Sequence, residues 1–174
     1  MKNRITILFT IILSFFLTFS CNDNDDEPEQ EPELETFLCC GENPFSNSNV
    51  DNLDQTMGEI IPSGAFSPNG DGLNDTFAIQ NIDLYANNTV IIYDIDDNVV
   101  FETNNYETNP FVGLNQSNSS ELPFGTYKYK IVIENETTFV EFGYVCLIRN
   151  FSESGDFSFI NCTAEDPNDP LLAQ

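Results

Sequence analysis

The sequence predicts an all-β domain, an immunoglobulin-like β-sandwich of six or seven strands that spans residues 60–150. Within this span, short runs rich in β-branched and aromatic residues alternate with clusters of Asn, Asp, Gly and Pro. No run keeps a helical period for more than one turn. A length of 174 residues suits one ordinary domain with tails. We therefore expect one core, an irregular Cys-containing collar at residues 36–59 and a short C-terminal extension at residues 151–174.

Six runs of residues are the predicted strands, and two of the turns between them have hairpin composition. The runs are residues 60–66, 76–82, 89–95, 98–102, 126–135 and 138–148. The Asp- and Asn-rich turn between Tyr93 and Val99 and the polar segment 135–138 predict tight connections. A further edge strand is expected within residues 151–162, followed by a frayed end.

The run 126–135 shows the clearest alternation of apolar and polar residues. Tyr127, Tyr129, Ile131 and Ile133 share one face, while the two lysines between them share the other. This pattern predicts one face in the core and one face in water.

The first 20 residues have the composition of a secretory signal peptide. Lys2 and Arg4 precede an apolar run broken only by Thr and Ser, and Cys21 follows it. A transmembrane helix is the alternative, but it requires roughly 18 or more apolar residues. The residues around Cys21 resemble the lipobox of bacterial lipoproteins. The acidic residues 22–35 resemble the tether that directs Bacteroidetes lipoproteins to the outer face of the outer membrane.

These resemblances imply three steps of maturation and placement. Residues 1–20 are removed, Cys21 is lipidated, and residues 21–35 hold the domain away from the membrane. The expected location is therefore the outer membrane, with a lipid anchor and the domain facing the cell surface.

Four cysteines remain after Cys21, and their even number in an exported chain suggests disulfides. They are Cys39, Cys40, Cys146 and Cys162. A bond between the adjacent Cys39 and Cys40 would be strained, so each is expected to pair with Cys146 or Cys162. A zinc site is disfavoured because the sequence has no His and no Cys-x-x-Cys.

The chain is strongly acidic, with 29 Asp and Glu against 5 Lys and Arg and a formal net charge of −24. Such a charge repels nucleic acid and anionic surfaces, so no nucleic-acid partner is expected. The absence of His and the location of the adjacent Asp pairs at 25–26 and 96–97, in the tether and a turn, predict a protein that is not an enzyme.

The stretch FSPNGDGLNDTF, residues 66–77, concentrates Asn, Asp and Gly and has two interpretations. Ser67, Asn69, Asp71 and Asp75 have the spacing of a calcium loop with oxygen ligands, although Ala78 stands where such loops have a bidentate Glu. Any calcium binding would therefore be weak. The alternative is a structural turn in which the glycines supply positive φ and the Asn and Asp side chains bind backbone amides. Turn chemistry explains every residue, so it is the preferred interpretation.

The run FSPNGDGLNDTFAIQNIDLYANNTVIIYD, followed by NVVFE, LPFGTYKYKIVI and FGYVCLIRN, resembles the gliding-motility-associated C-terminal domain family. These are the type B sorting domains of the type IX secretion system. The resemblance covers about residues 60–150. Two stretches depart from the family pattern: residues 95–97 replace its Arg-Trp-Gly, and residues 111–113 replace its Trp-Asp-Gly.

In the family this domain ends a large secreted protein, whereas here a further segment follows Arg149 and no cargo domain precedes it. We therefore expect a non-catalytic, surface-exposed outer-membrane lipoprotein. It would act as a protein-interaction or accessory subunit of an outer-membrane complex associated with secretion or gliding. The expected contacts are an exposed sheet edge or the aromatic loop 104–115. The alternative is a cell-surface carbohydrate- or adhesin-type binding module, against which the absence of Trp counts.

Overall fold

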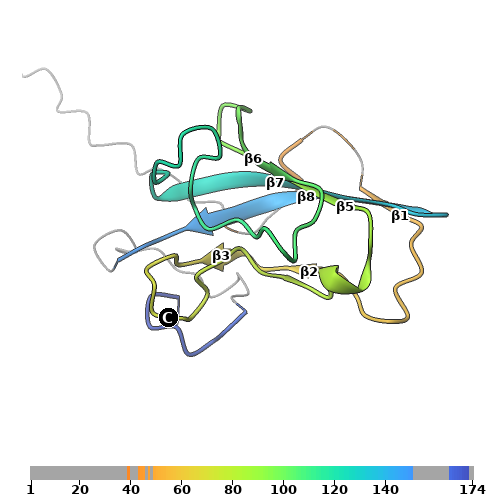
Figure 1. Ribbon diagram of the computed structural model, residues 1–174, viewed down its shortest axis with the longest axis horizontal. Coiled ribbons are helices and arrows are strands. Elements are labelled where there is room, and N and C mark those ends of the chain that lie inside the picture. The colour runs from red at the N-terminus through yellow and green to blue at the C-terminus, as the bar shows by residue number, and fades with distance from the viewer. Residues whose placement is uncertain (1–38, 40–42, 46, 48, 151–164, 173–174) are drawn as a thin grey trace, which may run out of the picture. The chain divides into compact units, whose positions relative to one another are not determined.

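A computed structural model describes residues 39, 43–45, 47, 49–150 and 165–172 (Figure 1). The chain divides into two units, residues 1–35 and residues 36–174. The predicted signal peptide, Cys21 and the acidic tether lie outside the described residues, as do Cys40 and Cys162. Among the described residues, no helix has the length and apolar character needed to cross a membrane.

The described part of the second unit is an all-β sandwich, which confirms the predicted fold class. Its elements are β1 (Val50–Asp51), β2 (Ile61–Pro62), β3 (Ala65–Phe66), β4 (Ile79–Gln80), a 3₁₀ turn (Ile82–Leu84), β5 (Asn88–Tyr93), β6 (Val99–Thr103), β7 (Gly125–Glu134) and β8 (Thr138–Leu147). The main sheet has the order β1-β8-β7-β5-β6, and β3 joins it in parallel with β8. Strands β2 and β4 form a second small sheet, which lies below the first in Figure 1.

Both predicted hairpins form where the local sequence places them. Strands β7 and β8 pair along their whole length, from Gly125 opposite Leu147 to Glu134 opposite Thr138. The β5–β6 turn is held by the carboxylate of Asp94, which accepts the N–H of Asp96 at 3.0 Å and of Asn98 at 2.9 Å. Such Asp-to-backbone bonds stabilise a turn without help from distant residues.

The first two predicted strands are shorter than expected and are divided between the two sheets. Residues 60–66 form β2 and β3, which are separated by Ser63 and Gly64. Strand β2 pairs with β4, whereas β3 crosses to the main sheet and pairs with the end of β8. Strand β4 ends at Gln80, because the next residue, Asn81, has a left-handed φ of 61° that is incompatible with a continuing strand. With β1 in the collar, these changes give eight strands in the described residues instead of six or seven.

One prediction about β7 is wrong: its second face is not uniformly in water. Lys128 is only 8% exposed, because Phe45 of the collar covers that face. The Lys128 ammonium lies 5.7 Å from the Phe45 ring centroid and donates to the carbonyl of Ile95 and to Asp97, each at 2.8 Å. Burial of this charge is tolerated because the ammonium is paired and hydrogen-bonded.

The core lies between the two sheets and is rich in aromatic side chains. Phe66, Phe77 and Phe111 are fully buried, and they pack against the inward-facing tyrosines of β7 and the aliphatic residues of β5. The Phe66 ring centroid lies 5.4 Å from that of Phe111, and the Phe77 centroid lies 5.3 Å from that of Tyr129. This aromatic layer fixes the start and the end of the loop that connects the two sheets, residues 66–77.

Candidate functional site

The 66–77 loop connects β3 to β4 and takes its shape from three residues with positive φ. Gly70 and Gly72 have φ of 83° and 91°, a region that glycine adopts without steric cost. Asn74 has φ of 46°, which Asn tolerates better than most residues. The backbone closes on itself, since the N–H of Ser67 donates to the carbonyl of Asn74 at 2.7 Å.

The carboxylates of the loop accept hydrogen bonds from its own backbone. Asp75 accepts the N–H of Gly70 at 2.7 Å on one oxygen and that of Gly72 at 2.8 Å on the other. Asp71 accepts the N–H of Leu73 at 2.9 Å and the side-chain amide of Asn69 at 3.0 Å. These contacts are the turn chemistry that the spacing of the residues predicts.

The four calcium candidates do not act as one group. Asn69, Asp71 and Asp75 share the turn network, whereas Ser67 is fully buried and its Oγ donates to Asp169 of the C-terminal extension. No set of three or more His, Cys, Asp or Glu side chains is arranged to hold a metal ion in the described part of the chain. Calcium binding by this loop stays a prediction.

Residues 165–172, which we call the tail segment, lie against the loop (Figure 1). Asn74 and Asp166 bind each other twice: the Asn74 amide donates to the Asp166 carbonyl at 2.9 Å, and the Asp166 N–H donates to Asn74 Oδ1 at 2.8 Å. The expected frayed end is therefore wrong for these residues, because specific bonds hold them on the domain.

Asp169 is the central contact of the tail segment and is fully buried. Its carboxylate accepts the Ser67 hydroxyl, the Asn74 side-chain amide at 3.0 Å and the N–H of Leu171 at 2.9 Å. A buried carboxylate requires such partners, because an unsatisfied one is costly. Ser67 and Asn74 therefore have a second role, which their positions in the loop sequence did not reveal.

Apolar contacts complete the docking of the tail segment. Leu171 and Leu172 form a buried cluster, separate from the main core, with Cys39, Ala65, Cys146 and Ile148. A disulfide joins Cys39 to Cys146, with their Cα atoms 4.6 Å apart and 107 residues apart in sequence. It attaches the collar to β8 beside the tail segment. Sequence reasoning missed this cluster, although the adjacent leucines after an Asp-rich turn were its signal.

The structure describes the aromatic loop and one of the sheet edges that could contact a partner. In the loop 104–115, the aromatic residues Tyr106 and Phe111 are buried and belong to the core. The free edge of β6 is capped by Gln116, whose side chain accepts the Glu102 N–H at 2.9 Å and donates to the Glu102 carbonyl at 2.8 Å. Neither an aromatic surface loop nor an open β6 edge is therefore presented.

The residues at the two departures from the resembled family pattern make specific contacts in the domain. Phe111, in the stretch where the resembled family has Trp-Asp-Gly, lies between Phe66 and Phe101, with centroid distances of 5.4 and 5.3 Å. Asp97, in the stretch where that family has Arg-Trp-Gly, forms the ion pair with Lys128 at 2.8 Å.

Comparison with known proteins agrees with this architecture. The family model of the CHU_C type IX secretion signal domain matches residues 60–147, from the start of the small sheet to the end of β8. No curated protein matches the chain. The match covers half of the chain and includes the 66–77 loop, both hairpins and the core between the sheets. The chain therefore belongs to the CHU_C type IX secretion signal domain family, which associates it with the type IX secretion machinery and the bacterial cell envelope.

Proposed function

We propose that the chain is a non-catalytic lipoprotein of the outer membrane that faces the cell surface and serves as an interaction subunit of an outer-membrane or secretion-associated complex. The observation that carries this proposal is the contact between the tail segment and the 66–77 loop. The tail segment lies outside the matched residues 60–147, and it buries Ser67 and Asn74 of the loop. The tail segment buries these two residues and leaves residues 69–72 exposed, so only the tip of the loop is accessible to a receptor that would read it as a free sorting signal.

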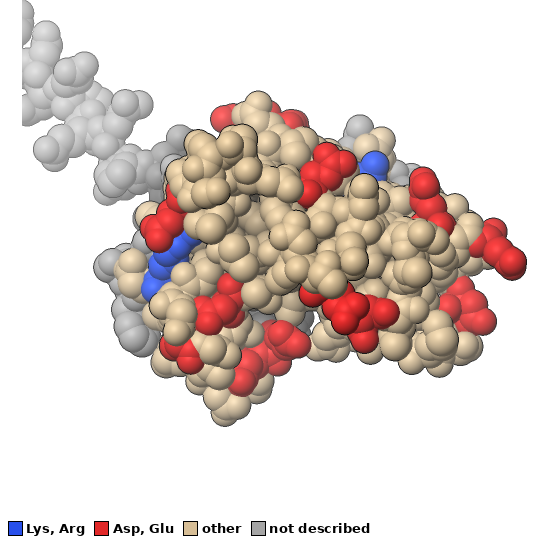
Figure 2. Space-filling view, in the orientation of Figure 1, with Lys and Arg blue, Asp and Glu red and all other residues tan. Residues whose placement is uncertain are grey.

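The charge of the surface favours a protein partner over nucleic acid. Acidic side chains are spread over the face drawn in Figure 2, where basic side chains are few. Together with a formal net charge of −24, this distribution repels polyanions. The proposal excludes catalysis because the chain has no His, and the Ser67 hydroxyl, which donates to the Asp169 carboxylate, is fully buried.

Anchoring rests on the sequence around Cys21. Lipid chains on Cys21 would hold the chain in the membrane, because each buried CH₂ contributes about 0.8 kcal/mol and several acyl chains act together. The acidic tether 22–35 would remain solvated and extended between membrane and domain.

Co-purification from native membranes tests the proposal directly. The tagged full-length chain, extracted in detergent and read by mass spectrometry, is expected to enrich one outer-membrane complex reproducibly. Cys21→Ser should release the chain from the membrane fraction, whereas Ser20→Ala, which keeps a small residue before the cysteine, should not. Enrichment of glycan with no protein partner would instead identify a carbohydrate-binding module.

Hydrogen exchange tests the covering of the loop. The amides of the 66–77 loop should be protected in wild type and exchange faster in Asp169→Ala, which removes the buried contact with Ser67 and Asn74. Glu165→Ala, an exposed change in the same segment, is the control. Equal protection in both variants would mean that the tail segment does not shield the loop, and the proposal would lose its structural support.

A further inference from the structure

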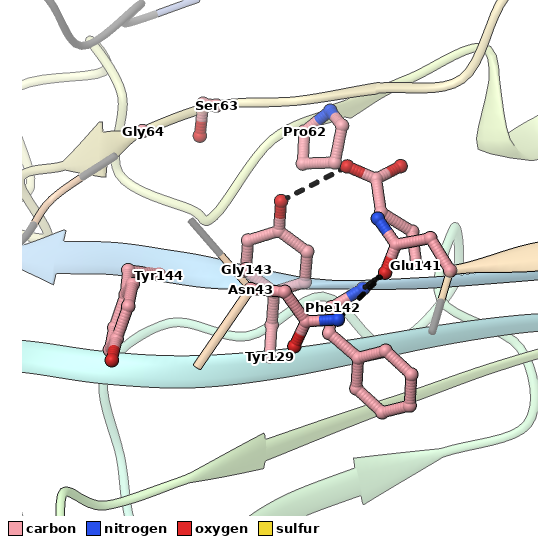
Figure 3. Close-up of a pocket in the computed structure, with 10 residues that line it drawn as sticks. Asn43, Pro62, Ser63, Gly64, Tyr129, Glu141, Phe142, Gly143 and Tyr144 are labelled. Carbon is pink, nitrogen blue, oxygen red and sulfur yellow. Dashed lines mark hydrogen bonds between the residues drawn. The ribbon is translucent and has the colours of Figure 1, made fainter. Parts of the chain in front are cut away.

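The outer edge of β8 is interrupted between its two partner strands. Strand β1 pairs with Phe139 and Val140, and β3 pairs with Cys146 and Leu147. Residues 141–145 between them have no strand partner on that side among the described residues. A pocket of about 220 Å³ occupies this gap (Figure 3).

Backbone groups of β8 line this gap. The N–H of Phe142 donates to the side chain of Asn49 at 3.2 Å, and the N–H of Cys146 donates to the carbonyl of Gly64 at 3.0 Å. Alternate residues of a strand direct their N–H groups to the same side, so the N–H of Tyr144 also points into the gap. The pocket therefore offers a backbone donor beside its side chains.

Gly143 shapes the floor of the pocket by admitting a tyrosine ring across the sheet. It faces Tyr129 on β7, and a Cβ at this position would lie 2.3 Å from the tyrosine oxygen. The ring therefore extends over β8, and its hydroxyl donates to Glu141 at 3.2 Å (Figure 3).

Glu141 carries a half-buried carboxyl group without a basic partner in the described part of the chain. Burial raises its pKa, the hydrogen bond from Tyr129 lowers it, and the negative charges of Asp51 and Glu59 raise it, with a net increase. A cation in the pocket would relieve this electrostatic cost.

Ser63 supplies an independent observation on the opposite wall. The residue is only 6% exposed, and its Oγ, directed toward the pocket in Figure 3, has no hydrogen-bond partner among the described residues. Buried hydroxyl groups are normally satisfied, so an orphaned one that lines a pocket points to a ligand.

The acceptors of this pocket match one ligand group. A primary ammonium has three N–H donors and no acceptor. The Glu141 carboxylate, the Ser63 hydroxyl and the oxygen of Tyr129 can each accept one of them, whereas the rings of Phe142 and Tyr144 point to the opposite face of β8 (Figure 3). A volume of about 220 Å³ is below the roughly 300 Å³ at which pockets for drug-sized ligands begin, which suits the end of a side chain.

We propose that the gap in the β8 edge binds a primary ammonium group, that of a lysine side chain on a partner protein. The Tyr144 N–H would donate a hydrogen bond to a backbone carbonyl of the ligand while the ammonium reaches Glu141. This assignment does not depend on the lipid anchor or on the covered loop, and it goes beyond the proposed function by naming the chemistry of one contact.

The probe is the peptide acetyl-Gly-Lys-Gly-amide, titrated into the ¹⁵N-labelled full-length chain and followed by NMR. Saturable shifts at the amides of residues 141–144 are expected. Glu141→Gln should weaken binding about tenfold or more, because a bond to a charged group is lost, and Ser63→Ala about threefold. Ser63→Ala should leave the melting temperature unchanged or raised, and Glu134→Gln, an exposed change on β7, should leave binding unchanged.

Three further titrations decide the chemistry. The same peptide with an acetylated lysine should not shift these amides, and equal shifts would overturn the proposal. Methylammonium alone should bind more weakly than the peptide. Equal binding would support a site for an ammonium group but would overturn its assignment to a protein lysine, and would identify a free amine as the ligand. Shifts with calcium or glucose at lower concentration than with the peptide, or no shifts with the peptide at all, would also overturn it.

Discussion

Gly143→Ala is expected to destabilise the domain, against the usual effect of this substitution. Gly143 lies inside β8 with no positive φ, so alanine fits its backbone. At such positions Gly→Ala stabilises by about 0.4–1 kcal/mol, because it restricts the unfolded chain. The sign of the effect therefore tests whether Tyr129 occupies the space above Gly143.

The expected magnitude follows from the distances to the tyrosine ring. The added Cβ would lie 2.3 Å from Oη, 2.4 Å from Cζ and 2.7 Å from Cε1 of Tyr129. Restoring ordinary contact requires the ring to move about 1 Å. The ring is only 7% exposed and packs 5.3 Å from Phe77, so it cannot rotate freely into solvent. Overpacking of this kind costs about 2–3 kcal/mol, and the gain of about 0.4–1 kcal/mol from the restricted unfolded chain leaves a net loss of about 1–2.6 kcal/mol.

Urea unfolding under non-reducing conditions measures this loss. Because the clash has one named partner, Gly143→Ala should become neutral or stabilising in a Tyr129→Leu background. A double-mutant cycle then gives the coupling between the two residues. Stabilisation by Gly143→Ala in the wild-type background, or an equal loss in both backgrounds, would refute the assigned position of the ring.

Three other changes test separate parts of the structure. Replacing Cys39 and Cys146 with Ala should lower the free energy of unfolding by about 4 kcal/mol, because the bond closes a loop of 107 residues; a loss below about 1 kcal/mol in urea unfolding would contradict this. Asp75→Asn keeps one of the two oxygen acceptors for the Gly70 and Gly72 amides, so it should lower the free energy of unfolding, measured with a chelator present, by about 1 kcal/mol. If calcium raises the melting temperature of wild type but not of this variant, the loop is a metal site instead. Glu141→Gln should stabilise the protein more at pH 7 than at pH 4, because a carboxyl with a raised folded pKa loses stability as pH rises through that pKa; an equal effect at both pH values in thermal unfolding would contradict it.

The parts of the fold that sequence reasoning predicted are those that depend on local chemistry. The hairpin at Asp94 follows from a side chain that binds backbone amides within four residues. The inward face of β7 follows from period-two alternation, and its residues pair with the adjacent strand in sequence. Both features require only neighbours along the chain, so single-sequence patterns contain them.

The errors concern contacts between residues far apart in sequence. The division of residues 60–66 depends on β3 pairing with β8, and nothing in that short run encodes its distant partner. Lys128 is buried because Phe45 of the collar covers it, which alternation within β7 cannot reveal. At the candidate site, the turn bonds of Asp71 and Asp75 were predictable from spacing, whereas the second role of Ser67 required the tail segment.

One edge of β8 contacts the disulfide, the tail segment and the proposed ammonium pocket, so these three features should be coupled. Cys146 bonds to the collar, pairs with Ala65 and lies two residues from Tyr144 of the pocket. Leu171 and Leu172 pack in the same cluster as Cys146. Since Ala65 directly precedes the 66–77 loop, displacement of the tail segment removes packing from the β3–β8 junction that closes one end of the pocket. Occupancy of the pocket and docking of the tail segment should therefore favour each other, because both depend on the same ordered edge of β8.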